Sequence, residues 1–352
     1  MRSKRLLALI GSVCLALVLA VPLVVACAAP AEGPAPEVAM EPQKWDLTVS
    51  GAATRFYDVE LSAAGARIKE RTGGLLDIRV VPSGGLPIKS EDWARAVSTG
   101  DLAMSGISGA YHAGEYPIWG ILDVPYLYTS FLEKRIVWEA VRPIFQREME
   151  KENIHILSYY PRFLQGLATN EPVDVMDLKG KKIRSYAKHI AIIIETLGGV
   201  AVPVAWAETY TAIQTGVVDG LLTGIDSCYH GSMYEVAPYM YDIGLIHGMW
   251  VIAVNKDLWD ALPKDVQNIV HEEMATFQGM SIARQPEEVG KIADDWLAKG
   301  GKGYEKIVDP AFFTLLREDA AKRVLEERLA AAGAVGEEIV TAIEQALGIT
   351  LG

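Results

Sequence analysis

Residues 177–220 read DLKGKKIRSYAKHIAIIIETLGGVAVPVAWAETYTAIQTGVVDG and alternate between strand-like and helix-like patterns. A helix follows the first strand, with apolar residues at i, i+3, i+4 and i+7 and a stop at Gly198-Gly199. A second helix, predicted over 208–215, ends at Gly216. Such alternation indicates parallel β-α-β units, and so an α/β fold. The strands predicted in this stretch are 182–184, 200–202 and 217–218, the last leading into a turn at Asp219-Gly220.

The same alternation extends on both sides of this stretch. From residue 264 onward the pattern changes to long helices, the last predicted over 320–347. Two α/β lobes braced by these late helices are the most economical arrangement. Lobe I is expected over 45–161 with 249–288, and lobe II over 162–248 with 289–352. The other predicted strands are 46–50, 76–81, 102–105, 154–160 and 250–255, and the other helices are 57–72, 91–98 and 133–152.

The composition of the 352 residues indicates a globular protein that avoids polyanions. Half of the residues are hydrophobic and 22% are charged, which excludes general disorder. The formal net charge is −12. Because such a surface repels phosphate backbones, no nucleic-acid partner is expected.

Residues 1–26 have the pattern of a secretory signal peptide. Arg2, Lys4 and Arg5 precede an apolar run over 6–26. Its length would also suit a membrane anchor, which is the alternative. No second apolar run of 18 or more residues follows, so the rest of the chain is expected outside the membrane, in a periplasmic or extracytoplasmic location.

Cys27 follows Val24-Val25-Ala26, a sequence similar to a bacterial lipobox, in which the cysteine carries the lipid. The segment 27–44 is rich in Ala, Pro and Glu without periodicity, which is typical of an extended tether. The sequence therefore predicts a lipoprotein anchored at Cys27. Ordinary cleavage without lipidation is the alternative. Cys228 is then the one thiol well inside the mature chain, so no intramolecular disulfide is expected.

The sequence lacks the usual signatures of catalysis. No two of the six histidines are three to five residues apart, so there is no local zinc motif, and no phosphate-binding glycine loop occurs. No cofactor, metal or catalytic residue is expected, and the protein is predicted not to be an enzyme. A secreted hydrolase that uses a pair of carboxylates or Cys228 stays an alternative, because carboxylates are plentiful.

Arg184 is the residue whose position points to a ligand. It ends the strand predicted at 182–184, just before a helix. Ligands of open α/β sheets bind at the carboxyl ends of strands, where the N–H groups of a following helix are also available. A guanidinium can hold a carboxylate with two parallel hydrogen bonds. Arg184 is therefore the main candidate for holding an organic acid, and pairing with a neighbouring acid is the structural alternative.

The stretch 177–220 closely resembles the substrate-binding proteins of TRAP transporters, the DctP-like extracytoplasmic solute receptors. The similarity rests on DLKGKKIR at 177–184, LGG at 197–199 and a spaced pattern from Glu208 to Gly220. Weaker similarity covers RTGG at 71–74, LDVPYLY at 122–128 and NKDLWDALPKDVQ at 255–267. The resemblance implies a periplasmic-binding-protein-like clamshell with crossing strands. Such a receptor closes on a small organic acid and delivers it to TRAP membrane permease subunits.

The resemblance also implies the roles of several residues. Arg184 matches the arginine that clamps the carboxylate, and Trp206 occupies an aromatic position that stacks on the ligand. Thr223 stands where many members have a ligand-contacting Asn. The second arginine of the family aligns near Gln165, so either it is missing or Arg162 serves from a shifted position.

Five further residues complete the predicted ligand site. Ser105 stands where sialic-acid-type members have a polar contact. Tyr160, Phe56 and Tyr111 are predicted at strand ends or loops that face the cleft, and Trp250 is included for its position. An aromatic, weakly cationic pocket favours an aromatic or aliphatic mono-acid over a dicarboxylate or sialate. A receptor that signals through a partner protein, instead of serving transport, is a further alternative.

Overall fold

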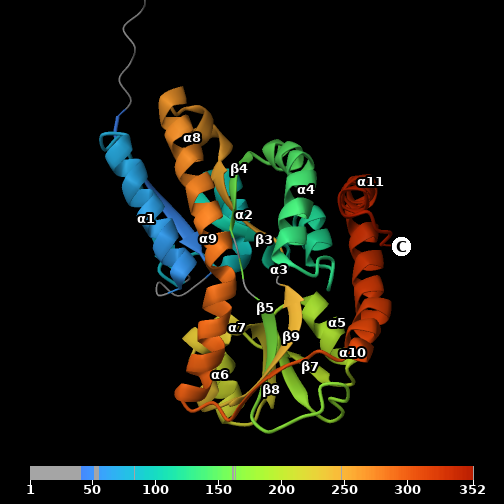
Figure 1. Cartoon of the computed structure of the whole chain (residues 1–352). Helices are drawn as coiled ribbons and strands as arrows, with labels where there is room; N and C mark the ends of the chain where they lie inside the picture. The colour runs from blue at the N-terminus through green and yellow to red at the C-terminus, as the bar shows by residue number, and fades with distance from the viewer. Residues whose placement is uncertain are drawn as a thin grey trace, which may run out of the picture. The chain divides into compact units, whose positions relative to one another are not determined.

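The computed structural model describes residues 41–50, 55–82, 84–160, 162, 164–246 and 248–351. The predicted signal peptide and Cys27 lie outside these residues. The folded part is a mixed α/β structure with two separate sheets (Figure 1). Its first strand, β1 (Gln43–Val49), begins two residues before the predicted start of lobe I at residue 45. Among the described helices, none is both long enough and apolar enough to cross a membrane.

The first sheet has the strand order β2-β1-β3-β10-β4. β1 is parallel to both β2 and β3, as the alternation of strands and helices predicts. β10 is inserted antiparallel between β3 and β4, although it follows them by about a hundred residues. This crossing strand ties the sheet together late in the chain. The bounds are β2 (Leu76–Pro82), β3 (Met104–Ser108), β10 (Trp250–Asn255) and β4 (Ile154–Tyr160), with helices α1 (Phe56–Arg71) and α2 (Trp93–Thr99) between the early strands.

The second sheet has the order β11-β9-β5-β8-β6-β7. β6 is parallel to β7 and β8, whereas β5 is antiparallel to β8 and β9. The sequence analysis found β6 and β7 but missed β5, β9 and β11. The bounds are β5 (Leu164–Thr169), β6 (Lys182–Ser185), β7 (Val200–Pro203), β8 (Gly220–Gly224), β9 (Tyr239–Ile246) and β11 (Gly303–Lys306), with helices α5 (Lys188–Thr196) and α6 (Trp206–Gln214).

The strand predicted at 217–218 is wrong, because β8 begins only at Gly220. The backbone N–H groups of Val217 and Val218 both bond to the carbonyl of Ala212, which closes the end of α6. Val217 is exposed, and Asp219 accepts the backbone N–H of Lys182 at 2.7 Å. Asp219 and Gly220, predicted as a turn after a strand, thus stand at the start of β8.

Local sequence explains the end of α5. Ile190, Ile193 and Ile194 are fully buried, in agreement with the predicted apolar stripe. Gly198 has φ +81°, a left-handed conformation that favours glycine after a helix. Its N–H bonds to the carbonyl of Glu195 at 2.9 Å, and this turn returns the chain into β7.

Three long helices complete the structure (Figure 1): α4 (Phe131–Lys151), α9 (Lys264–Ala298) and α11 (Lys322–Leu347). α9 contacts β4 of the first sheet and β11 of the second, and α11 contacts both α4 and α5. The late helices therefore brace both sheets, as the fold class predicts. α11 contacts α4, which packs on β4 of the first sheet, and α5, which packs on β7 of the second sheet. Because it contacts helices of both sheets, the exact lobe boundaries stay a prediction. The shorter helices are η1 (Ser90–Asp92), α3 (Gly109–His112), η2 (Pro117–Asp123), α7 (Ile225–His230), η3 (Met233–Glu235), α8 (Lys256–Asp260), α10 (Pro310–Leu315) and η4 (Leu316–Ala321).

Candidate functional site

A cavity of about 1190 Å³ lies where the parallel strands of both sheets end. On the side of the second sheet, its lining follows the carboxyl ends of β6, β7 and β8. On the side of the first sheet, it includes Ser50 after β1, residues 84–91 after β2 and Tyr111 after β3. Carboxyl ends of parallel strands are the usual place for a ligand in α/β folds, because the following loops and helix N-termini point their N–H groups there.

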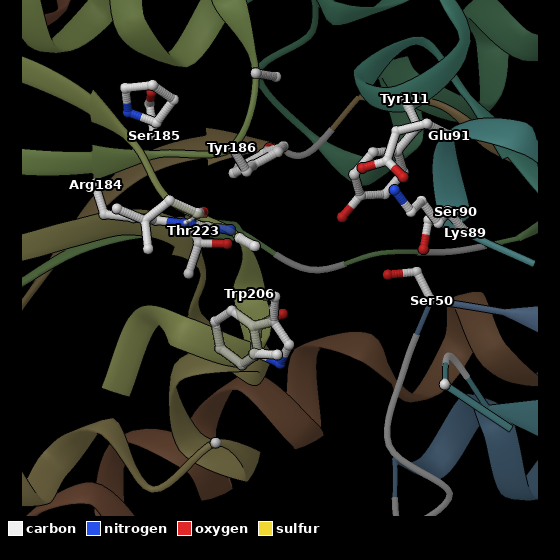
Figure 2. Close-up of a pocket in the computed structure, with 18 of the residues that line it drawn as sticks. Ser50, Lys89, Ser90, Glu91, Tyr111, Arg184, Ser185, Tyr186, Trp206 and Thr223 are labelled. Atoms are coloured by element: carbon white, nitrogen blue, oxygen red, sulfur yellow. Dashed lines mark hydrogen bonds between the residues drawn. The ribbon is translucent and has the colours of Figure 1, made fainter. Parts of the chain in front are cut away.

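The two walls of the cavity carry different side chains (Figure 2). Arg184, Thr223 and Trp206 lie on one side, and Tyr111 and Ser50 lie on the other. A ligand that occupies the cavity can therefore touch residues that come from both sheets.

Arg184 is a buried cation that no acidic side chain pairs with in the described part of the chain. It is 3% exposed, and no carboxylate lies within ion-pair distance of it among the described residues. Its Nε donates to the carbonyl of Val204 at 2.9 Å, and its guanidinium carbon lies 5.5 Å from the ring centre of Tyr186 and 5.7 Å from that of Trp206. Burial lowers its pKa from the ordinary value. Buried charges are normally paired, so this site favours an anionic ligand.

Aromatic rings surround this arginine. Trp206 is the first residue of α6 and is 39% exposed, so its indole is available for contact with a ligand. Tyr186 lies in the loop between β6 and α5 and accepts a hydrogen bond from Gln165. Across the cavity, Tyr111 and Trp250 make an edge-to-face contact with 5.6 Å between ring centres. The site combines the buried Arg184 guanidinium with aromatic rings from both sheets.

A second group of charges lies deeper in the cavity wall. Arg55 approaches Asp226 with 3.5 Å between Nε and Oδ2, and its Nη2 donates to Ser227 Oγ at 3.1 Å. Arg162 reaches the same Ser227 hydroxyl at 3.5 Å, and its guanidinium lies 5.1 Å from the ring centre of Trp250. Asp226 is thus ion-paired with Arg55, and the two guanidinium groups meet at the hydroxyl of the neighbouring Ser227.

The electrostatics of this pair of arginines follow from burial and pairing. Burial alone would raise the pKa of Asp226, but Arg55 and Arg162 outweigh it and hold the pKa below the ordinary value. Tyr57 also donates its hydroxyl to Asp226. Asp226 is therefore an ionised carboxylate that pairs with Arg55 and stabilises the charge of Arg162 through space.

The structure brings six of the ten predicted ligand residues to one cavity: Arg184, Trp206, Thr223, Arg162, Tyr111 and Trp250. The other four do not line it. Tyr160 is fully buried and donates to Asp58, and Ser105 is fully buried inside β3. Gln165 is also buried and reaches the cavity only through Tyr186. Phe56 starts α1 and packs under Arg284, whose guanidinium lies 5.3 Å from its ring centre.

The sequence analysis missed several residues of the lining, among them Arg55, Ser50 and Tyr186. A signal was available for Tyr186, which stands two residues after Arg184 and directly follows β6. No local pattern marks Arg55 or Ser50. Among the described residues, no group of three or more His, Cys, Asp or Glu side chains is placed to hold a metal ion.

Comparison with known proteins agrees with this architecture. The profile of the bacterial extracellular solute-binding protein family 7 matches residues 58–327. The C4-dicarboxylate-binding periplasmic protein DctP of Rhodobacter capsulatus is 25% identical over 286 residues, which cover 76% of this chain and 83% of that protein.

Two crystal structures illustrate the likeness of the fold. A TRAP solute-binding protein from an unidentified marine microbe, specific for pyroglutamate, has a TM-score of 0.77 and 26% identity, over 87% of this chain and 99% of that chain. DctP7 of Bordetella pertussis, which binds pyroglutamic acid, has a TM-score of 0.78 and 23% identity, over 86% of this chain and 99% of that chain.

These findings confirm the resemblance read from residues 177–220. The matched family consists of solute-binding receptors that bind small organic acids and work with membrane permeases, which does not favour the hydrolase alternative. The predicted fold class is also confirmed. The protein is an extracytoplasmic solute-binding protein of the TRAP type and belongs to the bacterial extracellular solute-binding protein family 7.

Proposed function

We propose that this receptor captures a small organic acid with one carboxylate and an apolar or aromatic body. The observation that carries the proposal is Arg184, a buried guanidinium without an acidic partner among the described residues. A ligand carboxylate would supply the missing anion through a bidentate pair. Trp206 and Tyr186 flank the guanidinium and would contact the body of the ligand.

The other two arginines of the cavity wall support a mono-acid over a diacid. Arg55 is already ion-paired with Asp226, and the same negative charge also acts through space on Arg162, so the charge of both arginines is partly neutralised inside the protein. A second ligand carboxylate would have to compete with Asp226 for them. The marine relative that binds pyroglutamate, a cyclic mono-acid, is consistent with this choice.

The cavity is larger than such a ligand requires, which fits a receptor that closes. Its volume of about 1190 Å³ exceeds the ~300–1000 Å³ of ordinary ligand pockets. We propose that the two sheets mark lobes I and II at the predicted boundaries, and that the lobes approach each other when ligand bridges both walls.

A ligand panel tests this function. Cyclic and aromatic mono-acids should raise Tm in a saturable way, because a ligand that binds only the folded state stabilises it by RT ln(1 + [L]/Kd). The best mono-acid should also reduce the radius of gyration in small-angle scattering. C4-dicarboxylates serve as the comparison. A larger Tm shift with dicarboxylates than with any mono-acid would contradict the proposed ligand class.

We further propose that the protein is held at the membrane by a lipid on Cys27. The support is the lipobox-like Val24-Val25-Ala26-Cys27 and the Ala/Pro/Glu-rich segment after it. Cells that express the wild type should incorporate radiolabelled fatty acid into the protein, and Cys27→Ser should not. Cys228→Ser is the matched control and should keep the label. An unlabelled wild type would mean ordinary cleavage of the signal peptide.

A further inference from the structure

A second cavity of about 820 Å³ shares no lining residue with the first. It lies between α4 and α9, above β4, and Figure 1 shows β4 running between these two helices. β4 is the edge strand of the first sheet, so this gap is not filled by a neighbouring strand. Its volume lies within the ~300–1000 Å³ that small-molecule pockets occupy. The apolar part of the lining consists of Leu157, Ala275, Gly279, Ile282 and Ala283.

The floor of this cavity offers unused hydrogen-bond donors. Ser158 is 5% exposed, and its buried Oγ has no partner among the described residues. Gln278 accepts the backbone N–H of Tyr159 through Oε1 at 3.0 Å, which leaves its NH₂ group without a partner in the described part of the chain. Buried hydroxyl groups are normally satisfied, so the open position beside Ser158 is a place for a ligand or water.

The rim is basic. Arg135 and Arg142 both line the cavity, and because they are seven residues apart on α4 they lie on one face of the helix. Neither forms an ion pair or a hydrogen bond with any described residue. Burial lowers the pKa of His271, and His155 and Arg142 lower it further, so this end of the cavity is electropositive.

Glu139 is the one acidic residue among those that line this cavity. It stands four residues after Arg135 and three before Arg142, yet no ion pair joins it to either in the described structure. The two guanidinium groups therefore keep their donors available.

We propose that the cavity between α4, β4 and α9 is a second binding site, for a phosphate-type oxyanion held by Arg135, Arg142, Ser158 and Gln278. Each of these residues can supply a donor, and they approach from a helix on each side and a strand below. A tetrahedral oxyanion accepts hydrogen bonds from several directions, and guanidinium groups suit it best. The apolar wall would contact the organic part of a phosphate ester.

Inorganic phosphate is the probe for this site. A titration followed by ¹H–¹⁵N NMR should show saturable shifts of the Gln278 side-chain NH₂ and of the Ser158 amide. Arg142→Gln should weaken binding by about tenfold or more, because a charged hydrogen bond is lost. Glu139→Gln should strengthen it, since a neighbouring negative charge is removed. Arg147→Gln, on the same helix but outside the cavity and ion-paired with Glu338, should change nothing.

Two further arms assign the anion and its source. Arg184→Ala should leave the phosphate shifts unchanged, which separates this site from the proposed ligand cavity. Sedimentation with phosphatidylglycerol vesicles, compared with phosphatidylcholine vesicles, distinguishes a lipid headgroup from a free phosphate ester. If the wild type binds phosphatidylglycerol vesicles and Arg142→Gln does not, the ligand is the lipid headgroup. If the wild type binds phosphate but not the vesicles, the ligand is a free phosphate ester. The proposal is wrong if neither probe binds, if Arg142→Gln binds phosphate as the wild type does, or if Arg184→Ala abolishes the shifts.

Discussion

Replacement of Arg184 by Ala should reduce the affinity for the best organic acid by roughly 30-fold to several-thousand-fold. Removing one partner of a desolvated, hydrogen-bonded charge pair typically costs about 2–5 kcal/mol, because the other charge stays buried and unpaired. The effect should be large here because Arg184 is buried and, among the described residues, no carboxylate pairs with it. Isothermal titration calorimetry with the ligand identified by the panel measures it directly.

Three variants make this result specific. Arg184→Lys should also weaken binding markedly, because an ammonium cannot reproduce the planar fork of the guanidinium. Trp206→Ala should cost less, about 1–3 kcal/mol, through lost stacking and buried area. Arg79→Ala is the control: Arg79 is exposed on β2, pairs with Asp46 and does not line the cavity. If folded Arg184→Ala binds within threefold of the wild type, the carboxylate is held elsewhere.

The largest effect on stability is expected from Asp226→Asn. This change leaves Arg55 buried without its ion-pair partner and removes the negative charge that also acts on the buried Arg162, and breaking a buried ion pair typically costs about 3–5 kcal/mol. Urea unfolding should show a lower midpoint with an unchanged slope. Asp46→Asn, in an exposed pair with Arg79, should have little effect and serves as the control.

The loss caused by Asp226→Asn should depend on pH with a definite sign. The pKa of Asp226 is lower in the folded protein than the value of ~3.9 expected for an unfolded chain. Its stabilising contribution is therefore fully present above about pH 4 and disappears as the pH falls through the folded pKa. The difference between wild type and variant should be constant near neutral pH and shrink in acid. A difference that grows in acid would contradict the role of Asp226 as a charged partner.

Much of the fold could be predicted because an amphipathic helix or strand has a periodic pattern of apolar residues within its own sequence. α5 buries one face, and its isoleucine stripe is visible in the sequence. β4 was predicted at its observed bounds, 154–160, and the parallel pairings around β1 and β6 follow from strand–helix alternation. In each case the information lies within one element and its nearest neighbours.

The missed strands lack such a local signal. β9 is buried on both faces over most of its length, so its sequence shows no alternation of apolar and polar residues. β11 reads GYEK and is mostly polar, and it is a strand because it pairs with β9. β5 lies between β8 and β9, and it is a strand because it pairs with residues more than 50 positions away in the sequence. Pairing over such distances depends on tertiary structure, not on local pattern.

The sequence by itself determined the α/β class, the family and the position of Arg184 at the end of a strand, because motif spacing and strand–helix alternation are local properties. Only the tertiary structure decided that the unpredicted Arg55 pairs with Asp226 and that Arg162 reaches the neighbouring Ser227. Only the structure likewise showed that Tyr160, Ser105, Gln165 and Phe56 lie outside the cavity lining. The physical reason is that the direction of a side chain, and the charge that neutralises it, depend on elements brought together from distant parts of the chain.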